Sequence, residues 1–169
     1  MFTKEQFIKT IQHETQVCKH LFGKIPSGGL EYRPTAGQRS LLELLQYLSA
    51  ALLTPTRSIL AADWSHAREE LDKTKTLQAE QFCEAMDRQC EEVIRLVQGI
   101  SDQDLLQKDT QTPLGQFKIG EALVNCPLKF ISCYRMQLFL YLKSLGVPNL
   151  TTYNCWGGID KPAEAPKSH

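Results

Sequence analysis

The chain has 169 residues, enough for one domain with a sizeable core, and its 42% hydrophobic and 22% charged residues are typical of soluble globular proteins. Lys and Arg together number 19, as do Asp and Glu, so the zero net charge gives no general attraction to nucleic acid or anionic membranes. The amphipathic N-terminus does not resemble a signal peptide, and no apolar run is long enough to span a membrane, so we expect a cytoplasmic protein.

The first helical pattern covers residues 3–22. Thr3 and Gln6 have the spacing of an N-terminal capping box, and Gly23 supplies a stop signal. The segment 24–38 is rich in proline and glycine, so we expect a long loop that crosses to the second helix.

The second helical pattern begins near Arg39 or Ser40, and leucines follow at helical spacing. Thr54 and Pro55 interrupt this pattern. Either the helix kinks at Pro55, or Thr54 caps a new helical segment with Pro55 in its first turn.

The third pattern covers residues 77–98, with an apolar side and a charged side, and Gly99 ends it. We expect a loop through Gly115, with a turn at residues 112–115, and we find no convincing alternating strand pattern.

The fourth pattern covers residues 118–145 and contains Pro127, so we expect a kink near Leu123. The sequence therefore predicts an all-α, four-helix bundle with a long crossover between its first two helices and an irregular C-terminal segment. We expect one domain over residues 1–160 and a disordered tail over residues 161–169.

Two motifs resemble the DinB/YfiT-like proteins. Residues 40–48 read SLLELLQYL, where that family has roughly S-x-x-E-L-L-x-H-L. Residues 130–138 read FISCYRMQL, where the family often has H-x-x-H-H-R-G-Q-L, and residues 141–146 resemble its ending. The resemblance runs from the first helix to Gly146 and implies a DinB-like four-helix bundle.

The resemblance also implies where a metal would bind, because family members with complete motifs hold a divalent ion through three histidines. Some of these relatives are thiol-dependent transferases or isomerases. At the matching positions this chain has Tyr47, Phe130 and Tyr134. Phenylalanine has no donor atom and tyrosine ionises only near pH 10, so we expect no metal and no cofactor at this site.

The remaining histidines and cysteines do not suggest a metal site. His13 and His20 lie two turns apart on the first helix, too far to chelate one ion, and we interpret them as surface residues. The six cysteines contain no C-x-x-C pair, and we expect small buried hydrophobic side chains. A reactive thiol at Cys133 is the alternative.

A polar pocket between the second and last helices is the first place to look for a site. Two further residues match the family motif without being metal ligands, namely Arg135 and Gln137. A buried arginine needs a carboxylate, and Glu43, one turn before Tyr47, is a candidate partner. A structural ion pair between helices is the plainer interpretation of Arg135, and an anion clamp is the alternative. The candidate pocket residues are Glu43, Tyr47, Phe130, Cys133, Tyr134, Arg135 and Gln137.

The segment 151–160 follows the last helix and contains Tyr153, Cys155 and Trp156 with two glycines. We expect it to fold back over one end of the bundle with Trp156 as its anchor. A pocket lid or a dimer contact is the alternative.

These patterns favour a metal-free protein that binds a small ligand or a protein partner near the pocket between the second and last helices. The alternative is a metal-independent or metal-dependent thiol transferase or isomerase, and the lost ligand set argues against catalysis. We expect a homodimer, as is common among relatives of this shape.

Overall fold

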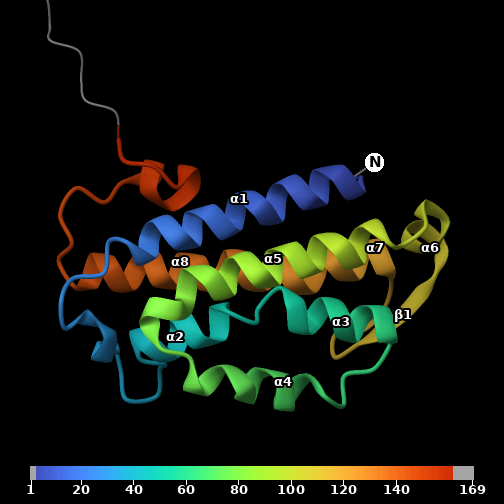
Figure 1. Ribbon diagram of the computed structural model, residues 1–169, viewed down its shortest axis with the longest axis horizontal. Coiled ribbons are helices and arrows are strands. Elements are labelled where there is room, and N and C mark those ends of the chain that lie inside the picture. The colour runs from blue at the N-terminus through green and yellow to red at the C-terminus, as the bar shows by residue number, and fades with distance from the viewer. Residues whose placement is uncertain (1–2, 162–169) are drawn as a thin grey trace, which may run out of the picture.

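The computed structural model describes residues 3–161, and its long helices run side by side around one hydrophobic core (Figure 1). The helices that form the bundle are α1 (Lys4–Phe22), α2 (Leu41–Leu48), α3 (Leu53–Ala61), α5 (Phe82–Gln98), α7 (Ile119–Leu123) and α8 (Lys129–Ser144). Helix α1 lies against both α5 and α8, α2 packs on α8, and α3 packs on α5. The all-α prediction is confirmed.

The core forms because apolar side chains three or four residues apart share one side of each helix. Ile11 of α1, Leu48 of α2, Met86 of α5 and Leu138 of α8 are each 0% exposed. The predicted caps are also present, since Thr3 and Gln6 form the capping box of α1. These contacts fix the position of α2 relative to α8.

The second helix breaks earlier than predicted, between Leu48 and Leu53. Thr54 lies inside α3 rather than at its cap, and Pro55 is the third residue, where its missing N–H costs no helical hydrogen bond. The buried Gln89 of α5 satisfies the broken backbone. Its amide accepts from the N–H of Leu52 at 3.1 Å and donates to the carbonyl of Leu48 at 2.7 Å.

Two short helices have no counterpart in the prediction. These are α4 (Ala67–Lys73) and α6 (Asp102–Gln107). Helix α4 has no buried residue, so no apolar periodicity marks it in the sequence. Helix α5 begins at Phe82, not at residue 77, because the preceding residues form shorter helical turns.

A two-stranded antiparallel sheet occupies part of the predicted loop, so the prediction that this loop contains no strand was wrong. Strand β1 (Asp109–Thr112) pairs with β2 (Gly115–Lys118), and the connection coincides with the predicted turn. The buried side chains of β1 are Thr110 and Thr112, which are not apolar, so hydrophobic alternation did not indicate a strand. The hydroxyl of Thr110 donates to the carbonyl of Ile59 at 2.7 Å.

Next to the predicted kink near Leu123, the structure has a π-helical turn, Val124–Leu128, which contains Pro127 and joins α7 to α8. A second π-helical turn, Tyr153–Gly157, lies in the C-terminal segment against α1 (Figure 1). Of the predicted tail, residues 162–169 lie outside the described residues. No helix within residues 3–161 is long and apolar enough to cross a membrane.

Candidate functional site

Tyr47 of α2 and Tyr134 of α8 are in ring contact, with centroids 4.5 Å apart and the planes inclined at 56°. Both side chains are half-buried. Phe130 lies one turn before Tyr134 on α8 and is half-buried against the core. The packing of α2 on α8 therefore brings together two residues that the sequence placed in one site.

Arg39, which the sequence analysis did not single out, stacks on this pair of rings. Its guanidinium carbon lies 4.3 Å from the centroid of Tyr47 and 5.5 Å from that of Tyr134. Arg39 comes directly before Ser40, the N-cap of α2, so the helix start fixes its backbone. A basic residue next to the cap was the only signal in the sequence.

The phenol of Tyr47 is protonated at neutral pH. Burial, followed by the neighbouring Tyr134, raises the pKa of Tyr47 to about 12, and the Arg39 guanidinium offsets only part of that rise. At pH 7 the hydroxyl of Tyr47 is therefore a neutral hydrogen-bonding group.

Glu43 caps the helix and does not pair with Arg135, so that suggested pair was wrong. Its carboxylate accepts from the N–H of Ser40 at 2.6 Å and from Arg33 at 3.3 Å. The backbone N–H of Ser40 is the main cause that holds the pKa of Glu43 below its usual value. The S-x-x-E spacing of Ser40 and Glu43 is the sequence signature of this arrangement.

Gln137 is linked to the backbone of Arg39 through Tyr141 rather than to the ring pair. Its amide donates to the hydroxyl of Tyr141 at 2.7 Å, and that hydroxyl donates to the backbone carbonyl of Arg39 at 3.0 Å. Gln137 therefore helps to hold the backbone that carries the stacked guanidinium. Cys133 is exposed on α8, while four of the other five cysteines are buried as predicted.

A cavity of about 530 Å³ is lined by Tyr47 and lies between the loop that precedes α2, α2 itself, α4 and the turn after α4. Of the seven candidate residues, Glu43 and Tyr47 line it. The other lining residues are Arg33, Ala36, Gly37, Gln38, Arg39, Gln46, Arg68, Leu71, Asp72, Thr74 and Lys75. The amide of Gln46 donates to the carbonyls of Lys75 and Leu77, which ties the far wall to α2.

Arg135 points away from this cavity, toward α1 and the C-terminal segment. Its side chain is 3% exposed and donates to the carboxylate of Glu14 and to the backbone carbonyl of Cys155. Successive helical residues lie about 100° apart, so Arg135 and Tyr134 cannot face the same neighbour. The predicted structural ion pair between helices is confirmed, with Glu14 as its acid.

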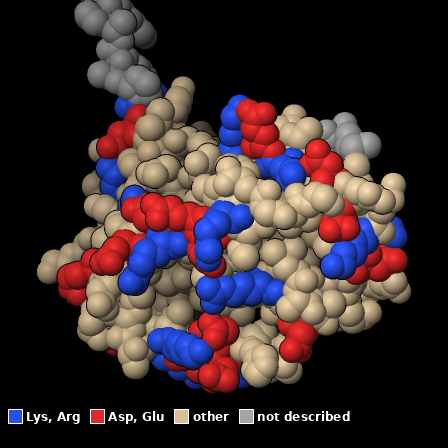
Figure 2. Space-filling view, turned by 45° about the vertical axis from the view of Figure 1, so that its right-hand side comes forward, with Lys and Arg blue, Asp and Glu red and all other residues tan. Residues whose placement is uncertain are grey.

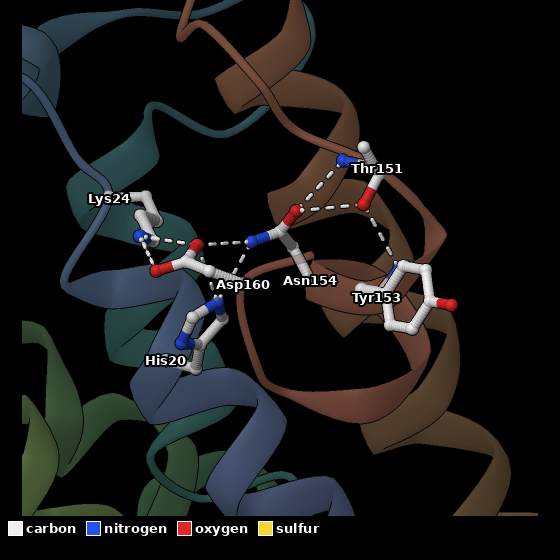
Figure 3. A network of polar contacts seen from close by, with 6 residues as sticks. All are labelled: His20, Lys24, Thr151, Tyr153, Asn154 and Asp160. Carbon is white, nitrogen blue, oxygen red and sulfur yellow. Dashed lines mark hydrogen bonds and ion pairs between the residues drawn. The ribbon is translucent and has the colours of Figure 1, made fainter. Parts of the chain in front are cut away.

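The C-terminal segment is fastened to α1 by a polar network around Asn154, whose side chain is 1% exposed (Figure 3). The amide of Asn154 donates to Asp160 at 2.8 Å and to His20 at 3.0 Å, and its oxygen accepts from the N–H of Thr151 at 2.8 Å. Lys24 pairs with Asp160 at 2.7 Å. Gly158, at φ 63°, fits closely against Val17.

Trp156 is not the anchor of this segment, because its side chain is 60% exposed. Cys155, 1% exposed, and Asn154 are the buried residues instead. The indole of Trp156 lies over Arg135 at 5.2 Å, and His13 donates to the Trp156 carbonyl at 2.6 Å. Both histidines of α1 thus contact the segment, and residues 3–161 contain no group of three His, Cys, Asp or Glu side chains suited to a metal.

Charges of both signs are mixed on the face of the molecule drawn in Figure 2. In the face shown in Figure 2, basic and acidic side chains lie next to one another between uncharged areas. Ion pairs between exposed side chains fit this mixture of charges, such as Lys9 with Glu5 at 2.7 Å and Lys73 with Glu70 at 2.5 Å, wherever they lie on the surface. This face carries no broad surface of one sign.

No family model and no curated protein matches this chain. Among solved structures, the crystal structure of a DinB-like protein, YjoA, from Bacillus subtilis is similar, with a TM-score of 0.66 and 15% sequence identity. The similarity covers 88% of this chain and 97% of that protein. The chain therefore has a DinB-like fold.

Proposed function

We propose that this protein binds a small molecule in the cavity beside Tyr47. The observation that carries the proposal is that Tyr47 and Arg39, which are in cation–π contact, both line one cavity. Its volume of about 530 Å³ lies within the range of about 300–1,000 Å³ that is typical of small-molecule sites. Glu43 accepts a hydrogen bond from the N–H of Ser40, and Gln46 donates one to the carbonyl of Lys75, so hydrogen bonds within the chain hold parts of the cavity lining.

The side chains at the ring pair support binding over metal-dependent transfer. Phe130 offers no donor atom. Tyr47, with its pKa raised to about 12, is a poor metal ligand and a poor general base at pH 7. We therefore propose a site without metal, and prefer a binding protein to the thiol transferase or isomerase that the sequence left open.

A fragment screen by protein NMR tests this proposal. We expect small molecules to perturb the amide signals of residues 33–47 and 68–75 more than those of the rest of the chain. The variant Ala36→Trp should abolish these perturbations because it fills the cavity with an indole. Ala61→Trp is the matched control, because Ala61 is exposed at the end of α3 and does not line the cavity.

Two results would argue against a binding site here. One is that no fragment perturbs this region, and the other is that Ala36→Trp and Ala61→Trp respond alike. A protein partner on the same surface, a homodimer and a cytoplasmic location stay predictions from the sequence. Light scattering of the purified chain tests the dimer.

A further inference from the structure

We propose that the ligand of this cavity is a small organic anion, with a carboxylate or phosphate group, and that Arg39 is its counter-ion. This inference rests on the proposed function, because it concerns the same cavity. It adds the charge of the ligand and the residue that recognises it.

The charged side chains around the cavity are unequal in number. Four are basic and two are acidic: Arg33, Arg39, Arg68, Lys75, Glu43 and Asp72. A chain with zero net charge therefore places an excess of positive charge around one concave site. Such a site attracts anions at close range.

Both acids are already engaged by other cavity residues. Glu43 accepts from the N–H of Ser40 and pairs with Arg33 at 3.3 Å. Asp72 pairs with Lys75 at 2.8 Å and with Arg68 at 3.4 Å. Neither carboxylate pairs with the guanidinium of Arg39.

Arg39 differs from every other arginine of the chain. All seven arginines lie within residues 3–161, and six of them form at least one ion pair with a carboxylate. Arg39 forms none with the described residues, although its guanidinium is held in place by the rings of Tyr47 and Tyr134. An oriented cation without an anion is the arrangement expected of a site that awaits a charged ligand.

The geometry favours an oxyanion over a halide or a neutral molecule. A guanidinium presents a planar fork of N–H donors that matches carboxylate and phosphate oxygens in pairs. A cation–π contact uses the positive charge of the guanidinium and no particular N–H group, so the N–H groups of Arg39 can still donate to an oxyanion. Tyr47, which also lines the cavity, carries a neutral hydroxyl as a further polar group.

The test is an NMR titration with benzoate and inorganic phosphate, beside neutral benzamide and cationic benzamidine. We expect benzoate, phosphate or both to shift the signals of residues 33–47. Benzamide and benzamidine should bind far more weakly. The more effective anion identifies the group that the natural ligand carries. Raised salt should weaken anion binding.

Variants at Arg39 assign the charge to one residue. Arg39→Gln should weaken anion binding by about tenfold or more, because charge-assisted hydrogen bonds are lost. Arg39→Lys keeps the positive charge but not the planar fork of donors, so its affinity for the anion should lie between those of the wild type and Arg39→Gln. Arg68→Gln is the matched control, since Arg68 lines the same cavity but pairs with Asp72, and should change affinity by less than about twofold.

The outcomes separate this inference from the function beneath it. If benzamide binds in the cavity as tightly as benzoate, and Arg39→Gln changes neither affinity, a ligand site exists but the inference of an anionic ligand is wrong. If no probe and no library fragment perturbs the cavity, the proposed function fails as well. A thermal midpoint for Arg39→Gln within about 2 °C of wild type would show that lost affinity is not lost folding.

Discussion

Arg39 and Arg135 both lie against aromatic rings, yet their surroundings differ in one respect. Arg135 lies under Trp156 at 3% exposure and has a carboxylate and a carbonyl as partners. Arg39 is exposed, lies on Tyr47 and Tyr134, and has no carboxylate partner among residues 3–161. Burial of a charge is costly unless it is paired, so Arg135 must be satisfied within the fold, whereas water can solvate Arg39 until a ligand replaces it.

The surroundings of the two arginines therefore have separate roles, and we call the sides of the molecule that carry them the Arg135 side and the Arg39 side. The Arg135 side joins α1, α8 and the C-terminal segment into one unit through buried polar contacts. The Arg39 side is a cavity wall whose charge is not consumed by the fold. Substitutions on the first side should lower stability, and those on the second should change binding.

The largest effect is expected from Glu14→Gln, which leaves the Arg135 guanidinium buried without its carboxylate. The free energy of unfolding should fall by about 3 kcal/mol, as when one partner of a buried pair is removed. Urea denaturation measures this loss. Arg39→Gln is the matched control and should cost less than about 1 kcal/mol, because only an exposed cation–π contact is lost. Equal losses in the two variants would contradict the contrast.

A smaller loss is expected from Asn154→Ala, which removes the centre of the network in Figure 3. The N–H of Thr151 and the Asp160 carboxylate each lose a partner, so we expect the free energy of unfolding to fall by about 1–3 kcal/mol. Proteolysis should then cut the C-terminal segment first, since its docking on α1 depends on these bonds. Tyr153→Ala, at an exposed neighbouring residue, should leave both stability and cleavage unchanged.

Most of the helical framework could be predicted from the sequence, because apolar spacing and caps are local signals. Thr3 with Gln6 is such a signal, and the predicted meeting of Tyr47 with Tyr134 came from two motifs. Contacts between residues far apart in the sequence were harder to predict. The hairpin at Thr110 was missed because its buried side chains are threonines and not apolar.

The two arginines show the same limit. Glu43 was a candidate partner for Arg135 by sequence position, but the pairing depends on which side of α8 faces α1. Arg39 gave almost no signal, because its role depends on two rings from helices far apart in the chain. Helical periodicity alone would have separated Arg135 from Tyr134, since neighbours point about 100° apart.

The smallest predicted effect is a pH dependence that belongs to the Arg135 side alone. Partial burial, and then the charge of Lys24, lower the pKa of His20 below its usual value, while Asp160 opposes the shift. The orientation of the Asn154 amide is set by the N–H of Thr151 and by the Asp160 carboxylate, so its N–H group faces the Nε2 of His20. That nitrogen must accept, and protonation would remove its lone pair.

The unfolded state therefore binds a proton more readily at His20 than the folded state does, and stability should fall as pH drops from about 6.5 through the lower folded pKa. Asp160 and the other carboxyl groups with lowered pKa titrate below this window. Urea midpoints between pH 7 and pH 5 should fall less in His20→Gln, whose side-chain oxygen can still accept from Asn154. Arg39→Gln should keep the wild-type dependence of the urea midpoint on pH. Tyr47, which contacts Arg39, has a pKa of about 12 and does not change its protonation state in this range. Identical slopes for wild type and His20→Gln would mean that the tether of the C-terminal segment does not sense pH through His20.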